Sequence, residues 1–244
     1  MKAWFMFLKI ILYPIAAILC PRKIMNKDKY KKYGRGQLVI SNHLSWMDIL
    51  YIYFGLPGGL KRTLSKKENE GNKLQSALMR SIGVIFVDRD KPELSSMRTC
   101  INALKDGQTL TICPEGTRNK VNRELQPLHS GAALFSLKGN AQVIPYVVHH
   151  KGKLFHRNYL GVGDPVDLSD LYGKRTDEAT LAEATERFRI ALQKTLDELD
   201  VWVEQKGWKK ANKQRKKEIK ADSRILKRKY KAAKKDYARS THSK

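Results

Sequence analysis

The sequence predicts an α/β fold, in one globular domain of about 200 residues with an additional segment at each end. Its apolar content, 41% of the residues, is adequate for a sizeable core. Short apolar runs typical of buried strands alternate with stretches typical of helices. Strands are expected at 37–40, 61–68, 83–89, 109–113 and 143–148, with one or two more in 153–168, and helices at 46–54, 74–82, 92–104, 131–137 and 176–202.

The chain begins with an apolar segment that suits a membrane. Residues 1–20 are almost all apolar or aromatic, interrupted chiefly by Lys9 and Pro14. Because Lys9 lies near the middle, a helix that lies in one leaflet or re-enters it is preferred to one that spans the bilayer. The alternatives are a signal peptide, although no small-x-small cleavage site follows, and an ordinary core helix. A membrane-associating helical segment is therefore expected at 1–28, followed by the main domain at 29–204.

A histidine and an aspartate stand where the strand at 37–40 meets the next helix. Residues five apart on an uninterrupted helix are separated by about 140°. His43 and Asp48 can therefore meet only if His43 precedes the first helical turn, with Asn42 or Ser45 as the capping residue. Asp48 would then hold one ring nitrogen and leave the other free to take a proton. The alternative is a surface histidine that caps a helix.

Basic residues end two later strands. The strand at 61–68 ends in a basic cluster that includes Lys66, for which a solvated loop is the alternative. The strand at 83–89 ends in Arg89, a good place to present a guanidinium to an anion.

The loop after the strand at 109–113 has the composition of a phosphate-binding loop. Gly116 permits close backbone approach, and Thr117 and Arg118 offer donors that Glu115 can orient. A polar turn with an internal Glu–Arg pair is the alternative.

The remaining elements have local signals of their own. Pro145 places its strand at an edge of the sheet or at a bulge. His149 and His150 are expected at the surface rather than as metal ligands, because nothing nearby completes a metal set. The helix at 176–202 is amphipathic, with apolar positions at Leu181, Phe188, Ile190, Leu192 and Leu196.

Charge is the unusual feature of the composition. The formal net charge is +24. Residues 205–244 hold 17 Lys and Arg against 3 Asp and Glu, which is +14 and leaves +10 for residues 1–204. Such a balance favours a polyanion, either an anionic membrane or a nucleic acid. The tail at 205–244 has too few apolar positions to build a core, so we expect a charged helix or a disordered tail.

The cysteines Cys20, Cys100 and Cys113 show no paired spacing. Neither a disulfide framework nor a zinc site is indicated. The main domain is expected to face a reducing compartment.

Four motifs together resemble, in order and spacing, those of the glycerolipid acyltransferase family. They are Asn42-His43-Leu44-Ser45-Trp46-Met47-Asp48 (HX4D), Gly83-Val84-Ile85-Phe86-Val87-Asp88-Arg89, Pro114-Glu115-Gly116-Thr117-Arg118 and Val143-Ile144-Pro145. Within the family the chain resembles the bacterial lysophosphatidic acid acyltransferases most, over about residues 35–170. The resemblance implies an α/β fold with a central mixed sheet flanked by helices and an N-terminal membrane-seated helical element.

The resemblance implies a role for each motif residue. His43 matches the general base and Asp48 its orienting partner. Arg89, and more loosely Lys66, match residues that hold the acceptor's phosphate.

The later motifs match the acceptor-binding loop and a motif for packing or acyl-chain contact. The acceptor-binding residues would be Glu115, Gly116, Thr117 and Arg118, and Pro145 matches the motif for packing or acyl-chain contact. Two positions depart from the family pattern: Cys113 stands where Phe is usual, and Asn119 where Ser is common. Neither change removes a group that the chemistry needs, although Cys113 alters the local packing.

The implied activity moves a fatty acyl group from acyl-CoA or acyl carrier protein to the free hydroxyl of 1-acylglycerol 3-phosphate, a lysophosphatidic acid, giving phosphatidic acid. Backbone N–H groups near the dyad or near Gly116 are candidate donors to the oxyanion. No metal and no cofactor besides the thioester are expected; anionic membrane lipids are expected partners, and nucleic acid is not. The alternatives are acylation of glycerol 3-phosphate, lyso-ornithine lipid or another lysophospholipid, or a non-catalytic protein that binds membrane or RNA through 205–244.

Overall fold

The computed structural model describes most of the chain between Tyr13 and Lys227. The described residues are 13–31, 35–57, 61–88, 94–119, 124–205, 213, 216–217 and 219–227. Residues 1–12, Arg89 and most of the tail lie outside them, so the expectations for these parts stay predictions.

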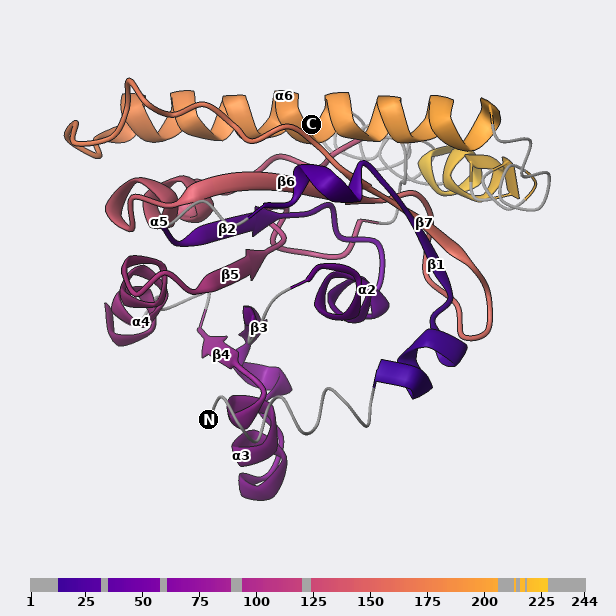
Figure 1. The fold of residues 1–244 in the computed structure, drawn as a ribbon, viewed down its shortest axis with the longest axis horizontal. Helices are drawn as coiled ribbons and strands as arrows, with labels where there is room; N and C mark the ends of the chain where they lie inside the picture. Colours follow the sequence, from indigo (N-terminus) through magenta and orange to yellow (C-terminus); the bar gives the residue numbers. More distant parts are fainter. Residues whose placement is uncertain are drawn as a thin grey trace, which may run out of the picture.

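The described strands form one mixed sheet, in the order β1-β7-β6-β2-β5-β3-β4 (Figure 1). Neighbours among β6, β2, β5, β3 and β4 run parallel, β7 runs antiparallel to β6, and β1 runs parallel to β7. The strands are β1 Arg22–Met25, β2 Gln37–Ile40, β3 Lys61–Lys66, β4 Val84–Val87, β5 Thr109–Ile112, β6 Gln142–Val148 and β7 Asn158–Val162. The expected α/β fold with a central mixed sheet is confirmed.

Helices flank this sheet at positions close to the expected ones. They are α2 Met47–Gly55, α3 Lys73–Ser81, α4 Leu94–Lys105, α5 Gly131–Lys138 and α6 Glu178–Gln205, with short 3-10 turns η1 Lys27–Lys29 and η2 Lys67–Asn69. Residues 13–19 are helical as well. Among the helices that the structure describes, none has both the length and the apolar character needed to cross a membrane.

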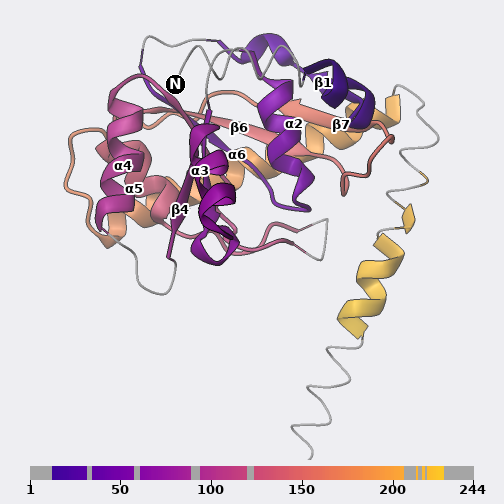
Figure 2. The ribbon, with the colours of Figure 1, turned by 90° about the horizontal axis from the view of Figure 1, so that it is seen from below.

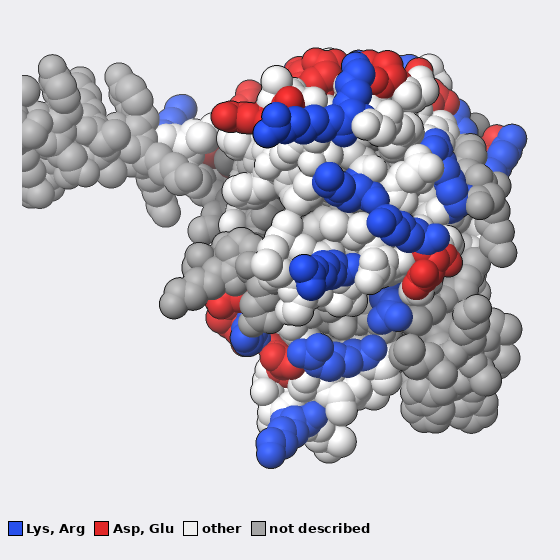
Figure 3. Space-filling model, turned by 90° about the vertical axis from the view of Figure 1, so that its left-hand side faces the viewer, with Lys and Arg blue, Asp and Glu red and all other residues white. Residues whose placement is uncertain are grey.

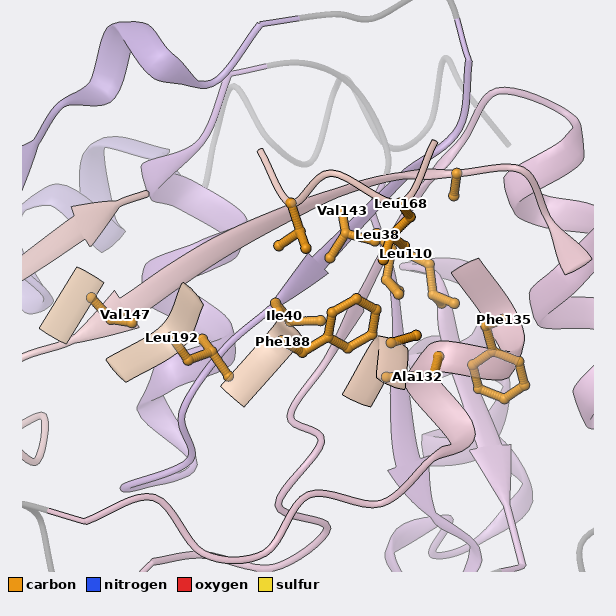
Figure 4. Packing of buried hydrophobic residues seen from close by; sticks show 14 of the residues in the cluster. Leu38, Ile40, Leu110, Ala132, Phe135, Val143, Val147, Leu168, Phe188 and Leu192 are labelled. Atoms are coloured by element: carbon orange, nitrogen blue, oxygen red, sulfur yellow. The ribbon is translucent and has the colours of Figure 1, made fainter. Parts of the chain in front are cut away.

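The central strand β2 is buried on both faces. Leu38 and Ile40 lie in a cluster with residues of α4, α5 and α6 (Figure 4). Val39 belongs to a second cluster, which includes Tyr51 and Ile52 of α2. A strand covered on both faces is apolar at successive positions rather than at alternate ones, and such a run predicts a buried strand.

Strand β1 corrects the expected boundary of the N-terminal segment. Its residues Arg22–Met25 were assigned to the membrane-associating helix but pair in parallel with Asn158–Gly161 of β7. The guanidinium of Arg22 donates to the carbonyl of Phe54 at 2.7 Å, which ties the strand to α2. A charged tetrapeptide has no strand signal of its own, so its pairing depends on a partner far along the chain.

Pro145 lies inside the sheet, so the expectation of an edge strand is wrong. β6 pairs with β2 on one side and β7 on the other. The Pro145 carbonyl faces β7, where it accepts from Gly163 N–H. The proline nitrogen, which has no hydrogen to donate, faces the same side. The register there shifts by one residue, between the Val143–Val166 bridge and the Tyr146–Val162 pair. This irregularity is the bulge that was the other expectation.

Three side chains lie differently from the expectation. Ile190 of α6 is 52% exposed rather than part of the core. His149 and His150 are buried rather than at the surface, with their Nδ1 atoms 3.1 Å apart. His149 Nε2 lies 3.3 Å from an oxygen of Asp200. Because Asp200 belongs to α6, the burial depends on a helix that packs over this end of the sheet, and local sequence cannot reveal it.

Candidate active site

The candidate site residues follow the carboxyl ends of neighbouring parallel strands. Ile40 of β2 pairs with Ile112 of β5, so the His43 loop and the 114–119 loop leave the same edge. Lys66 ends β3, which pairs with β5 and β4. This edge is where open parallel sheets bind ligands.

His43 and Asp48 meet as expected. His43 precedes α2, and its Nδ1 lies 3.1 Å from Asp48 Oδ2. Asp48 is fully buried, whereas the His43 side chain is 20% exposed. With Nδ1 facing the carboxylate, the ring geometry directs Nε2 away from it, so Nε2 is the nitrogen that can exchange a proton with a bound substrate.

The Asp48 carboxylate also organises the turn before its helix. Its Oδ2 accepts from the N–H groups of Leu44 at 2.7 Å and Ser45 at 2.6 Å, and its Oδ1 accepts from Ser45 Oγ at 2.9 Å. The expectation that Asn42 or Ser45 caps α2 is wrong, because the N-cap residue is Trp46 without a side-chain bond. Instead, the Asp48 side chain accepts from backbone N–H groups that precede the helix, as the acidic residue of a capping box does. These bonds fix the carboxylate against which His43 is held.

Asn42 fastens the histidine loop to β6, a role that sequence reasoning missed. Its Nδ2 donates to the Val148 carbonyl at 3.0 Å, and its Oδ1 accepts from Val148 N–H at 2.8 Å. A primary amide can make this paired contact with an extended backbone. An asparagine two residues after a central strand was the available signal.

Glu115 is turned inward and joins the two loops. Its Oε1 accepts from His43 N–H at 2.8 Å, and its Oε2 accepts from Asn119 Nδ2 at 2.8 Å and from Gln126 N–H at 2.9 Å. The side chain is only 2% exposed. Burial raises the pKa of the Glu115 carboxyl, and the hydrogen bonds from Gln126, His43 and Asn119 offset part of that rise.

This geometry changes two expectations about the loop. The resemblance implied that Glu115 binds the acceptor, but its oxygens bond to protein groups, including the backbone of His43. Asn119 does more than replace a serine, because Nδ2 also donates to the Glu124 carbonyl at 2.7 Å. A hydroxyl has one hydrogen and cannot donate to both acceptors at once.

Gly116 needs to be glycine for two reasons. Its φ is +70°, in the left-handed region. A Cβ here would lie 2.6 Å from His129 Cδ2. Beside it, the Thr117 hydroxyl donates to Gln126 Oε1 at 2.9 Å, so its proton is engaged. Arg118 is exposed at the same loop, where it can meet an anion.

The predicted basic residues are described in part. Lys66 is half-buried at the end of β3, and its strand partner is Val87 of β4. Arg89, two residues beyond Val87, lies outside the described residues, and its expected role stays a prediction.

Backbone N–H groups around the dyad have internal acceptors. Those of His43, Leu44 and Ser45 donate to Glu115 or Asp48. Those of Gly116 and Thr117 donate to carbonyls of their own turn. These five groups are therefore engaged in this conformation, contrary to the expectation that they are open to an oxyanion.

A histidine held by a buried carboxylate at the ligand-binding edge of an α/β sheet has the geometry that a general base needs. A family model described as Acyltransferase matches residues 22–149. The match spans more than half of the chain, and this chain belongs to the acyltransferase family.

Relatives with described activities support the same assignment. A 1-acyl-sn-glycerol-3-phosphate acyltransferase of Bacillus subtilis is 29% identical over 184 residues, which cover 72% of this chain and 90% of that protein. The same enzyme of Streptococcus pneumoniae is 24% identical, covering 72% and 67%. The crystal structure of the 1-acyl-sn-glycerophosphate acyltransferase of Thermotoga maritima has a TM-score of 0.55 at 22% identity, covering 73% and 72%, which shows the shared fold.

Proposed function

We propose that this enzyme transfers a fatty acyl group from a thioester to the free hydroxyl of 1-acylglycerol 3-phosphate, giving phosphatidic acid. The observation that carries the proposal is the contact of His43 Nδ1 with buried Asp48, at an edge where Lys66 and Arg118 also lie. The names of the relatives in Bacillus and Streptococcus support this acceptor.

The reaction proceeds by direct attack. The acceptor's hydroxyl gives its proton to His43 Nε2 as its oxygen bonds to the thioester carbonyl carbon. The tetrahedral intermediate collapses with cleavage of the carbon–sulfur bond, and the imidazolium returns the proton to the leaving thiolate. Asp48 holds the ring and stabilises the imidazolium while the proton is there. The histidine is regenerated, and no acyl-enzyme forms.

The acceptor's phosphate is held by the cations of neighbouring strand ends. Lys66 and Arg118, together with Arg89, would place the free hydroxyl beside His43. The thioester is acyl-CoA or acyl carrier protein. Both are cytoplasmic, so the catalytic domain would face the cytoplasm from a membrane surface.

The experiment is an acyl-transfer assay with the purified full chain in detergent micelles. Acceptors are 1-acylglycerol 3-phosphate, glycerol 3-phosphate, lyso-ornithine lipid and a neutral lysophospholipid, each with acyl-CoA and with acyl carrier protein. We expect phosphatidic acid as the main product, and we expect Arg118→Gln to raise the KM for 1-acylglycerol 3-phosphate. Activity restricted to any of the other three acceptors would contradict the acceptor assignment while leaving the acyltransferase assignment intact.

A further inference from the structure

The loop between β6 and β7 presents apolar side chains at the edge of the sheet that carries the candidate active site. Phe155 at its tip is 66% exposed, and Leu154 beside it is 44% exposed. Residues 151–157 contain two lysines, one arginine and no acidic residue. We call this segment the interfacial loop, because exposed apolar groups flanked by cations suit a boundary between water and anionic lipid.

Phe155 is held in this exposed position by its backbone. Its φ is +60°, a conformation that bulky residues rarely adopt. Its N–H donates to the Leu19 carbonyl at 2.7 Å, at the end of the helix formed by residues 13–19. Ile15 and Ile18 on that helix are exposed too. The loop and the helix lie side by side (Figures 1 and 2), and both carry exposed apolar side chains.

The base of the loop packs on the helix that carries Asp48. A Cβ placed on Gly152 would lie 2.6 Å from Tyr51 Cε2 and 2.9 Å from Met47 Cβ, both on α2. Trp46, between the two dyad residues in sequence, is 60% exposed. The apolar surface is therefore next to the candidate site, where a lipid acceptor would have to enter.

Charge is distributed so that one side of the domain would avoid an anionic surface. α6 holds seven acidic and three basic residues, a net charge of −4 in a chain of +24. It covers one face of the sheet, whereas the base of the interfacial loop packs on α2 at the other face (Figure 1). Figure 3 shows the side of the domain away from the interfacial loop, and acidic side chains gather at its top, where α6 lies.

We propose that the interfacial loop and the helix at 13–19 form one surface that docks on an anionic lipid bilayer. Phe155 inserts at the headgroup level, and the basic residues beside it contact lipid phosphates. The docked enzyme takes its acceptor from the membrane surface. The inference rests on the proposed function only in that the acceptor is a lipid, and binding is measured without turnover.

The first test is the binding of the full chain to vesicles, either of phosphatidylcholine alone or of equal parts phosphatidylcholine and phosphatidylglycerol. Phe155→Asn keeps a residue that tolerates positive φ, and we expect it to weaken binding to both vesicles about tenfold. Lys153→Glu should weaken binding about tenfold only where phosphatidylglycerol is present, and less at high salt. The matched controls, Ile190→Ser on α6 and Lys138→Glu at the end of α5, should bind like wild type.

A second measurement reports insertion directly. Brominated phospholipids should quench the added fluorescence of Phe155→Trp but not of Ile190→Trp. The proposal is overturned if Phe155→Asn and Lys153→Glu bind like wild type and the two tryptophans are quenched alike. Acyl transfer in detergent micelles should be unchanged in Phe155→Asn. If the wild-type protein shows no acyl transfer in micelles, this result counts against the proposed function and not against docking.

Discussion

Glu115→Gln tests whether the inward carboxylate positions the catalytic loop. Glu115 accepts three hydrogen bonds on its two oxygens. In either amide orientation, glutamine points its NH2 group at a donor, His43 N–H in one case and Asn119 and Gln126 in the other. A lost hydrogen bond to a charged group costs about 1.5–3 kcal/mol. We therefore expect a loss of about 2–3 kcal/mol in the free energy of unfolding, measured by urea titration.

The kcat should fall more than the loss of stability explains, because the hydrogen bond from His43 N–H to Glu115 holds the backbone of His43 in place. A displacement of about 1 Å at a reacting group costs about a hundredfold. We expect kcat of Glu115→Gln to fall about that much at temperatures where it stays folded, while the KM for the acceptor changes little. Glu204→Gln, an exposed change on α6, is the control. An increased KM with unchanged kcat would refute the reasoning, because Glu115 would then contact the acceptor itself.

Three further predictions concern burial and backbone conformation. Because the pKa of Glu115 is raised above 4.5, this carboxyl loses its proton at a lower pH in the unfolded state than in the folded state, so its contribution to the free energy of unfolding falls as pH rises from 4.5 through the raised pKa. The urea midpoint of wild type should fall over this pH range relative to that of Glu115→Gln, and a constant difference between the two midpoints would contradict the prediction. Burial raises the pKa of the Cys100 thiol to about 12, so iodoacetamide at pH 8 should modify Cys100 in urea but not in the native protein, where partly exposed Cys113 reacts first. Labelling of Cys100 in the native protein, detected by mass spectrometry, would disprove the prediction. Gly116→Ala should lower acyl transfer at least tenfold, because the methyl group meets His129 and an alanine in the left-handed backbone conformation costs about 1–2 kcal/mol. Wild-type values of kcat and KM in this variant would show that the loop conformation is not required.

Features with a local cause were predictable from the sequence. β2 is apolar because both of its faces are covered, and α2 follows it directly. His43 and Asp48 belong to one turn, so six residues of sequence contain both partners of the contact. The family resemblance added the order of the motifs along the chain.

Features that depend on distant partners could not be predicted. β1 is a strand because β7 pairs with it, more than 130 residues later. His149 is buried because α6 covers it, and Asp200, its partner there, lies far along the chain. Glu115 has the composition of a ligand-binding residue, but its direction is set by the N–H groups of two other segments. Side-chain direction in loops follows from tertiary contacts that residue type alone does not determine.

The most direct test of the account compares wild type, His43→Ala and Asp48→Asn in acyl transfer to 1-acylglycerol 3-phosphate. The account predicts that wild type makes phosphatidic acid, and that each variant stays folded and is slower by about a thousandfold, since one lacks the base and the other favours the wrong ring tautomer. Replacing His242 in the tail by alanine should leave the rate unchanged. Near-normal turnover by His43→Ala would contradict the central claim, because the proton would then pass to some other group.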